Sequence, residues 1–163
     1  MGISFTDDSI IEYCQNYGDI SSSTNAGGIV GVNLKSMHIS HCLNAGSINN
    51  TIHYCGGIVA DFFDGTISHC INIGAVSGGS FNNFIGITGG IAGAFGAYYS
   101  TSSISNCINT GLIRGTHQVG GITGQFNVAI MSGCINTAPV EGTTNTGCIV
   151  GAKTLNSVIN NCY

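Results

Sequence analysis

Charged side chains are scarce in this chain, and tryptophan is absent. Only 6% of the 163 residues are charged, against about 25% in an ordinary soluble domain. The cations are limited to Lys35, Arg114 and Lys153, and the formal net charge is −4. Because nucleic acids and anionic membrane surfaces are held by many Lys and Arg side chains, this shortage excludes both as partners.

Proline occurs once, at Pro139, and long apolar runs are missing. The longest weakly polar stretch, 84–99, is too short and too rich in glycine for a membrane-spanning helix. The polar start MGISFTDDS does not read as a secretory signal peptide. We therefore expect no membrane insertion. Either an export signal is encoded upstream of this chain, or the protein is not exported.

Cysteine, in contrast, is plentiful and regularly placed, with eight residues. The phrase ISHCLNAG at 39–46 returns as ISHCINIG at 67–74 and as ISNCINTG at 104–111. Self-similarity at a fixed period is the signature of a repeat protein. Aligned on this phrase, successive cysteines are 28, 28, 37, 27 and 28 residues apart: Cys14, Cys42, Cys70, Cys107, Cys134 and Cys162.

Two further sets of residues follow the same period. Two residues after each of the first five cysteines there is an asparagine, giving Asn16, Asn44, Asn72, Asn109 and Asn136. About half a period away lies a Gly-Gly-Ile phrase, which is Gly-Cys-Ile in its last copy, with the isoleucines Ile29, Ile58, Ile91, Ile122 and Ile149. Each period therefore contains two short apolar segments separated by turn residues.

The composition of these segments favours strands over helices. Ile, Val, Thr and Ser dominate them, helical apolar spacing is missing, and the 26 glycines would destabilise most helices. Coils stacked about 4.8 Å apart would let each residue lie on its own copy. The sequence predicts an all-β fold, a β-solenoid (parallel β-helix) of about five to six coils with a period near 28 residues. We expect residues 1–163 to form one such domain of a longer protein.

Strand parity places the repeated residues on an inner face. Alternate residues of a strand point to the same face. One face of each strand therefore carries a thiol, an amide, a glycine without a side chain and an aliphatic group, as in Cys42, Asn44, Gly46 and Ile48. Stacked on their copies, the six thiols should form a column, and the five asparagines should link their amides into a ladder. The isoleucines of the Gly-Gly-Ile phrase should form a further column in the core. We interpret all three columns as structural.

The phrase GGITGQ followed by an Ile-Ser-x-Cys phrase resembles the GLUG repeats of bacterial surface proteins, adhesins and the non-catalytic regions of immunoglobulin A-cleaving metallopeptidases. The resemblance covers nearly the whole chain. Where that family usually has Gly-Gly-Leu-Val-Gly and Asn-Cys-Tyr, this chain has Ile in place of Leu and keeps the aromatic residue only in Cys162-Tyr163. The resemblance implies a secreted, cell-surface β-solenoid that serves as a spacer or adhesive stalk, and it implies no particular ligand.

The cysteines are open to three interpretations. Eight cysteines in an exported protein suggest disulfides, and closing a loop of about 28 residues would contribute roughly 3–4 kcal/mol. Stacked residues have Cα atoms about 4.8 Å apart, but their parallel Cβ vectors fit a disulfide torsion badly. We expect buried free thiols, with disulfides as the main alternative and a metal or redox site as the third. Cys55 and Cys148 lie outside the column and should not meet.

Two further pairs of residues have chemical interest. His41 and His69 share an outward repeat position, about 5 Å apart, but that position offers no third ligand, so we expect a stacked pair and no metal site. Asp61 and Asp64 lie close together at a predicted turn. β-Helices that act on polysaccharides use clustered carboxylates, but no neighbouring coil has one at the matching position. We expect a solvated corner, no catalysis and no cofactor.

The third coil, at about 78–103, is longer than the others. Its insertions at 79–86 and 94–103 carry aromatic residues on loops that the core does not require. They form a candidate platform for a glycan or for a protein of the host or a neighbouring cell, although they could instead pack against the core. These aromatic residues are Phe81, Phe84, Phe95, Tyr98 and Tyr99.

The first and last repeats have no polar cap. The chain is then either a piece of a longer surface protein or a unit that pairs end to end into a filament. In the filament, an outward apolar column would serve lateral contact: Leu43, Ile71, Ile108 and Ile135. The sequence predicts a non-enzymatic structural or adhesive module of a secreted or cell-surface protein. A self-assembling fibre subunit and a polysaccharide-acting β-helix enzyme are the alternatives.

Overall fold

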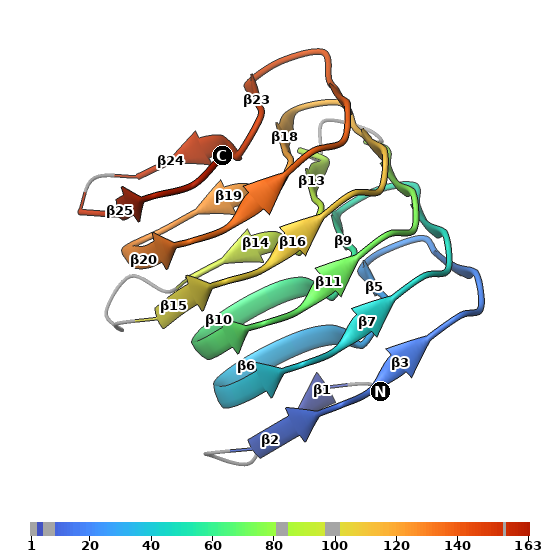
Figure 1. Ribbon diagram of the computed structural model, residues 1–163. Coiled ribbons are helices and arrows are strands. Elements are labelled where there is room, and N and C mark those ends of the chain that lie inside the picture. Colours follow the sequence, from blue (N-terminus) through green and yellow to red (C-terminus); the bar gives the residue numbers. More distant parts are fainter. Residues whose placement is uncertain (1–2, 5–8, 81–84, 97–101, 155) are drawn as a thin grey trace.

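The chain winds into a stack of coils whose strands pair in parallel with strands of the neighbouring coils (Figure 1). This computed structural model describes residues 3–4, 9–80, 85–96, 102–154 and 156–163. The described residues contain no helix, and so none that could cross a membrane. The stack has about five turns with a period near 28 residues, which confirms the predicted β-solenoid.

The strands of the described residues form four sheets, one of ten strands and three of five. In the first sheet, the long strands β6 (Val30–Ser40) and β10 (Val59–Ser68) are matched in the other coils by pairs of shorter strands. Its members are β1 (Ile3–Ser4), β2 (Ser9–Glu12), β6 (Val30–Ser40), β10 (Val59–Ser68), β14 (Ala92–Phe95), β15 (Ser102–Ser105), β19 (Thr123–Phe126), β20 (Ala129–Ser132), β24 (Val150–Lys153) and β25 (Val158–Asn160).

The three smaller sheets follow in the same order in every coil. The second sheet contains β3 (Gln15–Asn16), β7 (Leu43–Asn44), β11 (Ile71–Asn72), β16 (Ile108–Asn109) and β21 (Ile135–Asn136). The third contains β4 (Ile20–Ser22), β8 (Ile48–Asn50), β12 (Val76–Gly78), β17 (Ile113–Arg114) and β22 (Val140–Glu141). The fourth contains β5 (Ala26–Gly27), β9 (Tyr54–Gly56), β13 (Ile87–Gly89), β18 (Gln118–Gly120) and β23 (Thr146–Gly147).

Equivalent positions of the repeat lie directly over one another. Asn72 pairs with Asn44 on one side and with Asn109 on the other, and Ile67 pairs with Ile39. Because parallel strands bond to the coils above and below, each coil supplies backbone hydrogen-bond partners to the next. The same register gathers like side chains into columns.

A sharp corner joins the first sheet to the second. The residue before each column cysteine has a positive φ, between 50° and 62°. This left-handed conformation is free of strain for Gly and tolerated by Asn, but it costs other residues energy. The corner leaves the following thiol within reach of a carbonyl two residues earlier, as for Cys70 and Ser68. The corner residues are Tyr13, His41, His69, Asn106, Gly133 and Asn161.

Two clusters of buried side chains fill the interior of the coils. In the larger one, Ile58, Ile91 and Ile122 form a column and are 0% exposed, with the partly buried Ile29 and Ile149 packed against the cluster. Each fully buried isoleucine contributes about 1.5–3 kcal/mol. The smaller cluster lies between the third and fourth sheets and contains Ala26, Ile48, Cys55, Val76, Ile113 and Val119.

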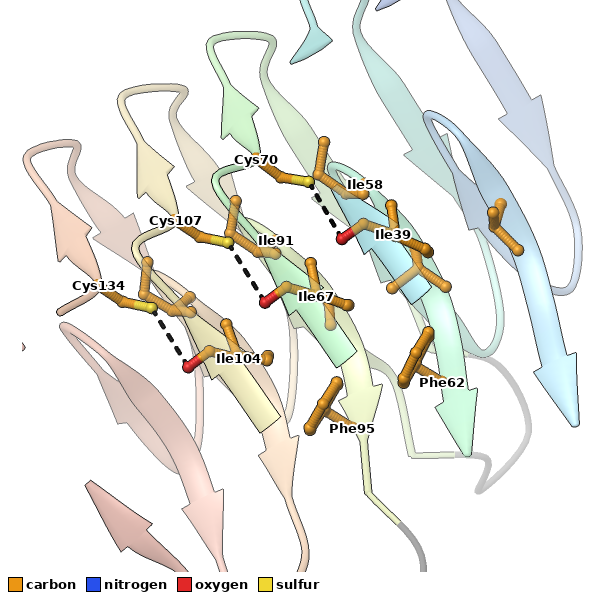
Figure 2. Close-up of a cluster of buried hydrophobic side chains, with 14 of the residues drawn as sticks. Ile39, Ile58, Phe62, Ile67, Cys70, Ile91, Phe95, Ile104, Cys107 and Cys134 are labelled. Carbon is orange, nitrogen blue, oxygen red and sulfur yellow. Dashed lines mark hydrogen bonds between the residues drawn. The ribbon is translucent and has the colours of Figure 1, made fainter. Parts of the chain in front are cut away.

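Three phenylalanines also stack inside the larger cluster. The ring centroids of Phe62 and Phe95, which Figure 2 shows side by side, are 5.0 Å apart with planes at 3°. Those of Phe95 and Phe126 are 5.9 Å apart with planes at 19°. Asn33 pairs with Phe62 and Lys153 with Phe126, so a polar residue stands at each end of this column. The predicted loop position of Phe95 is therefore wrong, since pairing with Phe62 carries it into the core.

The predicted turn at Asp61 and Asp64 is also wrong, because both residues lie within β10. Asp61 pairs with Val32 and with Ala94, and β10 continues to Ser68. The register with β6 shifts between Phe62 and Asp64, so the strand is irregular there without ending. Backbone pairing with the coils on both sides keeps this segment extended.

The extra residues of the third coil lie in two places. Residues 79–86 separate β12 from β13, and residues 96–101 separate β14 from β15, where the preceding coil has the continuous strand β10. Four of the five residues of the candidate aromatic platform lie outside the described residues: Phe81, Phe84, Tyr98 and Tyr99. The platform stays a prediction at these positions.

The glycine that ends the Asn-x-Gly phrase offers a test of coil stacking. A Cβ at Gly74 would overlap the carbonyl of Gly46 in the preceding coil, whereas at Gly18 the nearest atom is Asn16 Oδ1 at 3.8 Å. We expect Gly74→Ala to lower the free energy of unfolding by about 1–3 kcal/mol, and Gly18→Ala to change it little. Urea denaturation measures both. Equal losses in the two variants would contradict the close contact between coils.

Candidate functional site

The asparagine column is a continuous ladder of amide hydrogen bonds. Nδ2 of Asn44 donates to Oδ1 of Asn72 at 2.8 Å, and Asn72 donates to Asn109 at 2.7 Å. The same bond joins Asn16 to Asn44 and Asn109 to Asn136, in both cases at 2.7 Å. Each Nδ2 also donates to the backbone carbonyl two residues later, at 2.8–2.9 Å. The ladder thus satisfies amides that are buried in the core.

The second glycine of the Gly-Gly-Ile phrase makes room for this ladder. A Cβ at Gly57 would collide with the side chain of Asn72 and with the backbone of the next coil. In the last copy of the phrase Cys148 occupies this position, and Nδ2 of Asn136 approaches its Sγ at 3.7 Å. The amide column explains the glycine in the other four copies, where a Cβ would collide with an asparagine side chain: Gly28, Gly57, Gly90 and Gly121.

The cysteine column lies at the corner after the first sheet, and all eight cysteines of the chain are free thiols. Each inner thiol of the column donates to the carbonyl two residues earlier and to a carbonyl of the preceding coil. For Cys107 these acceptors are Ser105 at 3.3 Å and Ile67 at 3.9 Å (Figure 2). The inner members are 0–1% exposed: Cys42, Cys70, Cys107 and Cys134.

Contacts between neighbouring thiols of the column shift their pKa values in opposite directions. The Cys107 thiol lowers the pKa of Cys134 and, together with the Cys42 thiol, that of Cys70. Contact with the thiols of Cys134 and Cys70, together with burial, raises the pKa of Cys107. Burial likewise raises the pKa of Cys55 to about 12 in the smaller core cluster, whereas Cys148 is exposed. Because the thiolate is both the nucleophile and the metal ligand, the protonated thiols of Cys55 and Cys107 act as small packing groups.

His41 and His69 stack on the outer side of the same corner. Their ring centroids are 5.0 Å apart with planes at 3°, and Tyr13 stacks on His41 at 5.0 Å. Nδ2 of Asn106, next in the column, lies 3.4 Å from Nε2 of His69. Among the described residues, no group of three or more His, Cys, Asp or Glu side chains could hold a metal ion.

A hollow of about 310 Å³ opens where the fourth sheet meets the first. Asp61 and Phe63 flank the buried Phe62 in β10, so strand alternation turns both of them away from the core. Ala94 and Gln125 take the Asp61 position in the next two coils. We call this feature the Asp61 hollow. It is lined by Tyr54, Asp61, Phe63, Ala94, Gly96, Gln125 and Asn127.

Among the described residues, none donates a hydrogen bond to the carboxylate of Asp61. Burial alone raises the pKa of Asp61 from 3.8 to about 6, with no lowering by a hydrogen bond or an opposite charge from any described residue. Burial, and then the charge of Asp61, raises the pKa of Tyr54. Oδ1 of Asn127 is also buried without a hydrogen-bond partner. The hollow is therefore the candidate functional site of the described part of the chain.

The sequence contains a signal for this site that alignment on the cysteines hides. Counted from the isoleucine of the Gly-Gly-Ile phrase, the phenylalanines of the stack follow at the same distance: Phe62 after Ile58, Phe95 after Ile91 and Phe126 after Ile122. Alignment on this phrase makes the Phe position inward, and alternation then makes Asp61 a strand residue on the outer face.

Comparison with known proteins bears on the fold. No protein-family model and no curated protein matches the sequence. Among solved structures, the chain is similar to the crystal structure of a "putative immunoglobulin A1 protease from Bacteroides ovatus", with a TM-score of 0.69 and 20% sequence identity. The match covers 91% of this chain and 49% of that chain, so this chain spans about half the length of that protein. The likeness shows a related fold, and the resemblance to GLUG repeats stays a prediction.

Removing one rung of the ladder should strongly destabilise the fold. In Asn72→Ala, an Asn44 N–H and the Asn109 Oδ1 lose their partners in a buried column. Each unsatisfied group costs about 1–3 kcal/mol, so we expect a loss of about 2–5 kcal/mol. The exposed Asn49→Ala is the control and should change stability by less than about 0.5 kcal/mol. Urea denaturation compares them, and a loss no larger than that of the control would show that the ladder contributes nothing.

The buried carboxylate of Asp61 should make stability depend on pH. Since its pKa is raised to about 6 in the folded chain, the fold prefers the protonated form, and this stabilisation disappears as the pH rises from 3.8 to 6. We expect Asp61→Asn to increase the free energy of unfolding by about 1–3 kcal/mol at pH 7.5 and to leave it unchanged near pH 3.5. Urea denaturation at both pH values tests this. The control Asp64→Asn, three residues away, should show no such pH-dependent gain.

Proposed function

We propose that this chain is a non-enzymatic structural module of a secreted or cell-surface protein, where it serves as a stalk or binding scaffold. The observation that supports the proposal is the amide ladder, which runs from Asn16 to Asn136. Side chains thereby join each coil to the next in addition to the backbone bonds. A stack connected in this way suits a spacer that carries load along its axis.

The surface chemistry and the comparison support the same role. With only 6% charged residues, the chain relies on neutral hydrogen-bonding side chains for its solubility. The similar structure is of a longer protein, of which this chain matches 49%. We infer that the solenoid holds other parts of a surface protein at a distance, and that glycans or proteins of a neighbouring cell are its partners.

Mechanical unfolding tests the stalk role directly. The chain is placed between two marker domains and stretched by single-molecule force spectroscopy. We expect a distinct rupture event whose force falls in Asn72→Ala and is unchanged in Asn49→Ala, because only the first removes a rung of the ladder. Smooth extension at low force would contradict a load-bearing module.

A second experiment tests whether the chain is non-enzymatic. The purified chain is incubated with immunoglobulin A1 and with an acidic polysaccharide, and the products are separated by mass spectrometry and chromatography. We expect both to remain intact. Cleavage that disappears in Asp61→Asn and persists in Asp64→Asn would overturn the proposal in favour of a hydrolase.

A further inference from the structure

The Asp61 hollow has the size and composition of a small-ligand site. Its volume of about 310 Å³ lies at the lower end of the range of about 300–1,000 Å³ that is usual for ligand pockets. Phe63 stands at its wall with 48% of its surface exposed, so its ring is accessible to a ligand in the hollow. An aromatic wall with a few convergent polar groups is typical of a binding pocket.

The polar groups of the hollow select the charge of its occupant. The Asp61 carboxylate is largely buried, and no cation or donor of the described residues compensates it. Ala94 and Gln125 occupy the position of Asp61 in the next two coils and line the hollow with it, and neither of them carries a charge. A buried carboxylate is stabilised most by a positive group that also donates hydrogen bonds. An ammonium group satisfies both needs.

The aromatic side chains favour the same occupant. A cation near the face of a phenylalanine or tyrosine ring is attracted by the ring quadrupole. Phe63 and Tyr54 both line the hollow together with Asp61. A ligand that carries an ammonium group on a short stem could place its charge at Asp61 and its stem against Phe63.

We propose that the Asp61 hollow binds a small primary ammonium ligand, with Asp61 as the counter-ion and Phe63 as the wall for its stem. The stem can belong to an amino sugar or to an aliphatic amine, and both present the same ammonium chemistry. This site is separate from the stalk role, since it lies on the outer face of the coils and uses no member of the amide ladder.

Titration with matched ligands tests the proposal. The ¹⁵N-labelled chain is titrated at pH 7.5 with D-glucosamine, N-acetyl-D-glucosamine and n-butylamine, and the amide signals of Ala94, Gly96 and Asn127 are followed by NMR. We expect saturable shifts with glucosamine or butylamine and none with the neutral N-acetyl sugar. Binding of glucosamine alone would identify an amino sugar as the ligand, and equal binding of both amines would identify the aliphatic ammonium group.

Variants and pH give independent readouts of the same site. Because the pKa of Asp61 is about 6 in the free chain, affinity for an amine should fall about tenfold between pH 7.5 and pH 5. Asp61→Asn should abolish binding at pH 7.5, Phe63→Ala should weaken it severalfold, and Asp64→Asn should leave it unchanged. Urea denaturation of each variant confirms that it is folded.

Three outcomes would overturn the proposal. The first is equal binding of glucosamine and its N-acetyl form, which would remove the role of the charge. The second is affinity that does not change between pH 7.5 and pH 5. The third is the absence of saturable shifts at Ala94, Gly96 and Asn127 with any of the amines in a chain that is folded. None of these results bears on the rupture force of the stalk.

Discussion

In-register pairing of parallel strands is the constraint on which the other features of this molecule depend. Each coil obtains its backbone hydrogen bonds from its neighbours, and the pairing places Asn72 between Asn44 and Asn109. Side-chain amides can form a ladder only if they are separated by one strand spacing of about 4.8 Å. A shift of the strand register by one residue would bury the outward residues and expose the amides. The register therefore makes the ladder possible, and the ladder in turn stabilises this register.

The residues of the repeated phrase lie where one coil closely approaches the next. Glycine is required opposite the asparagine ladder, as at Gly57, because a Cβ there would collide with Asn72. At the corner a residue of positive φ, such as Asn106, turns the chain so that the next thiol points inward. The cysteine therefore recurs for reasons of size and weak hydrogen bonding.

Features that repeat with the period can be predicted from the sequence, whereas features that depend on a break in the period cannot. The columns built on Cys42, Asn44 and Ile58 could be predicted because their spacing is regular and their parity fixes one face. The Phe column could not be predicted from the cysteine alignment, because the extra residues of the third coil fall in two places and separate Phe95 from the cysteine register. The two aspartates of β10 were then assigned to a turn.

The Asp61 hollow could not be predicted from the sequence either, and the reason is physical. Its lining residues come from four strands, and from the residues that directly follow two of these strands, in three coils. Asp61 acquires its raised pKa only through burial by that surface. Local sequence around Asp61 contains an acid between apolar residues, and nothing in it specifies Gln125 or Asn127 as neighbours. Ligand sites of solenoids arise between coils, so they need the stacking order before they can be recognised.

The polar ends of the phenylalanine column have a consequence for the dynamics of the molecule. Asn33 and Lys153 limit the aromatic stack to the three coils of Phe62, Phe95 and Phe126. The same three coils contain Ile58, Ile91 and Ile122, which have no exposed surface. In a linear array, local opening begins where the interfaces between neighbours are weakest. The central windings should therefore exchange their amide protons last, and the outer windings should fray while that central unit stays closed.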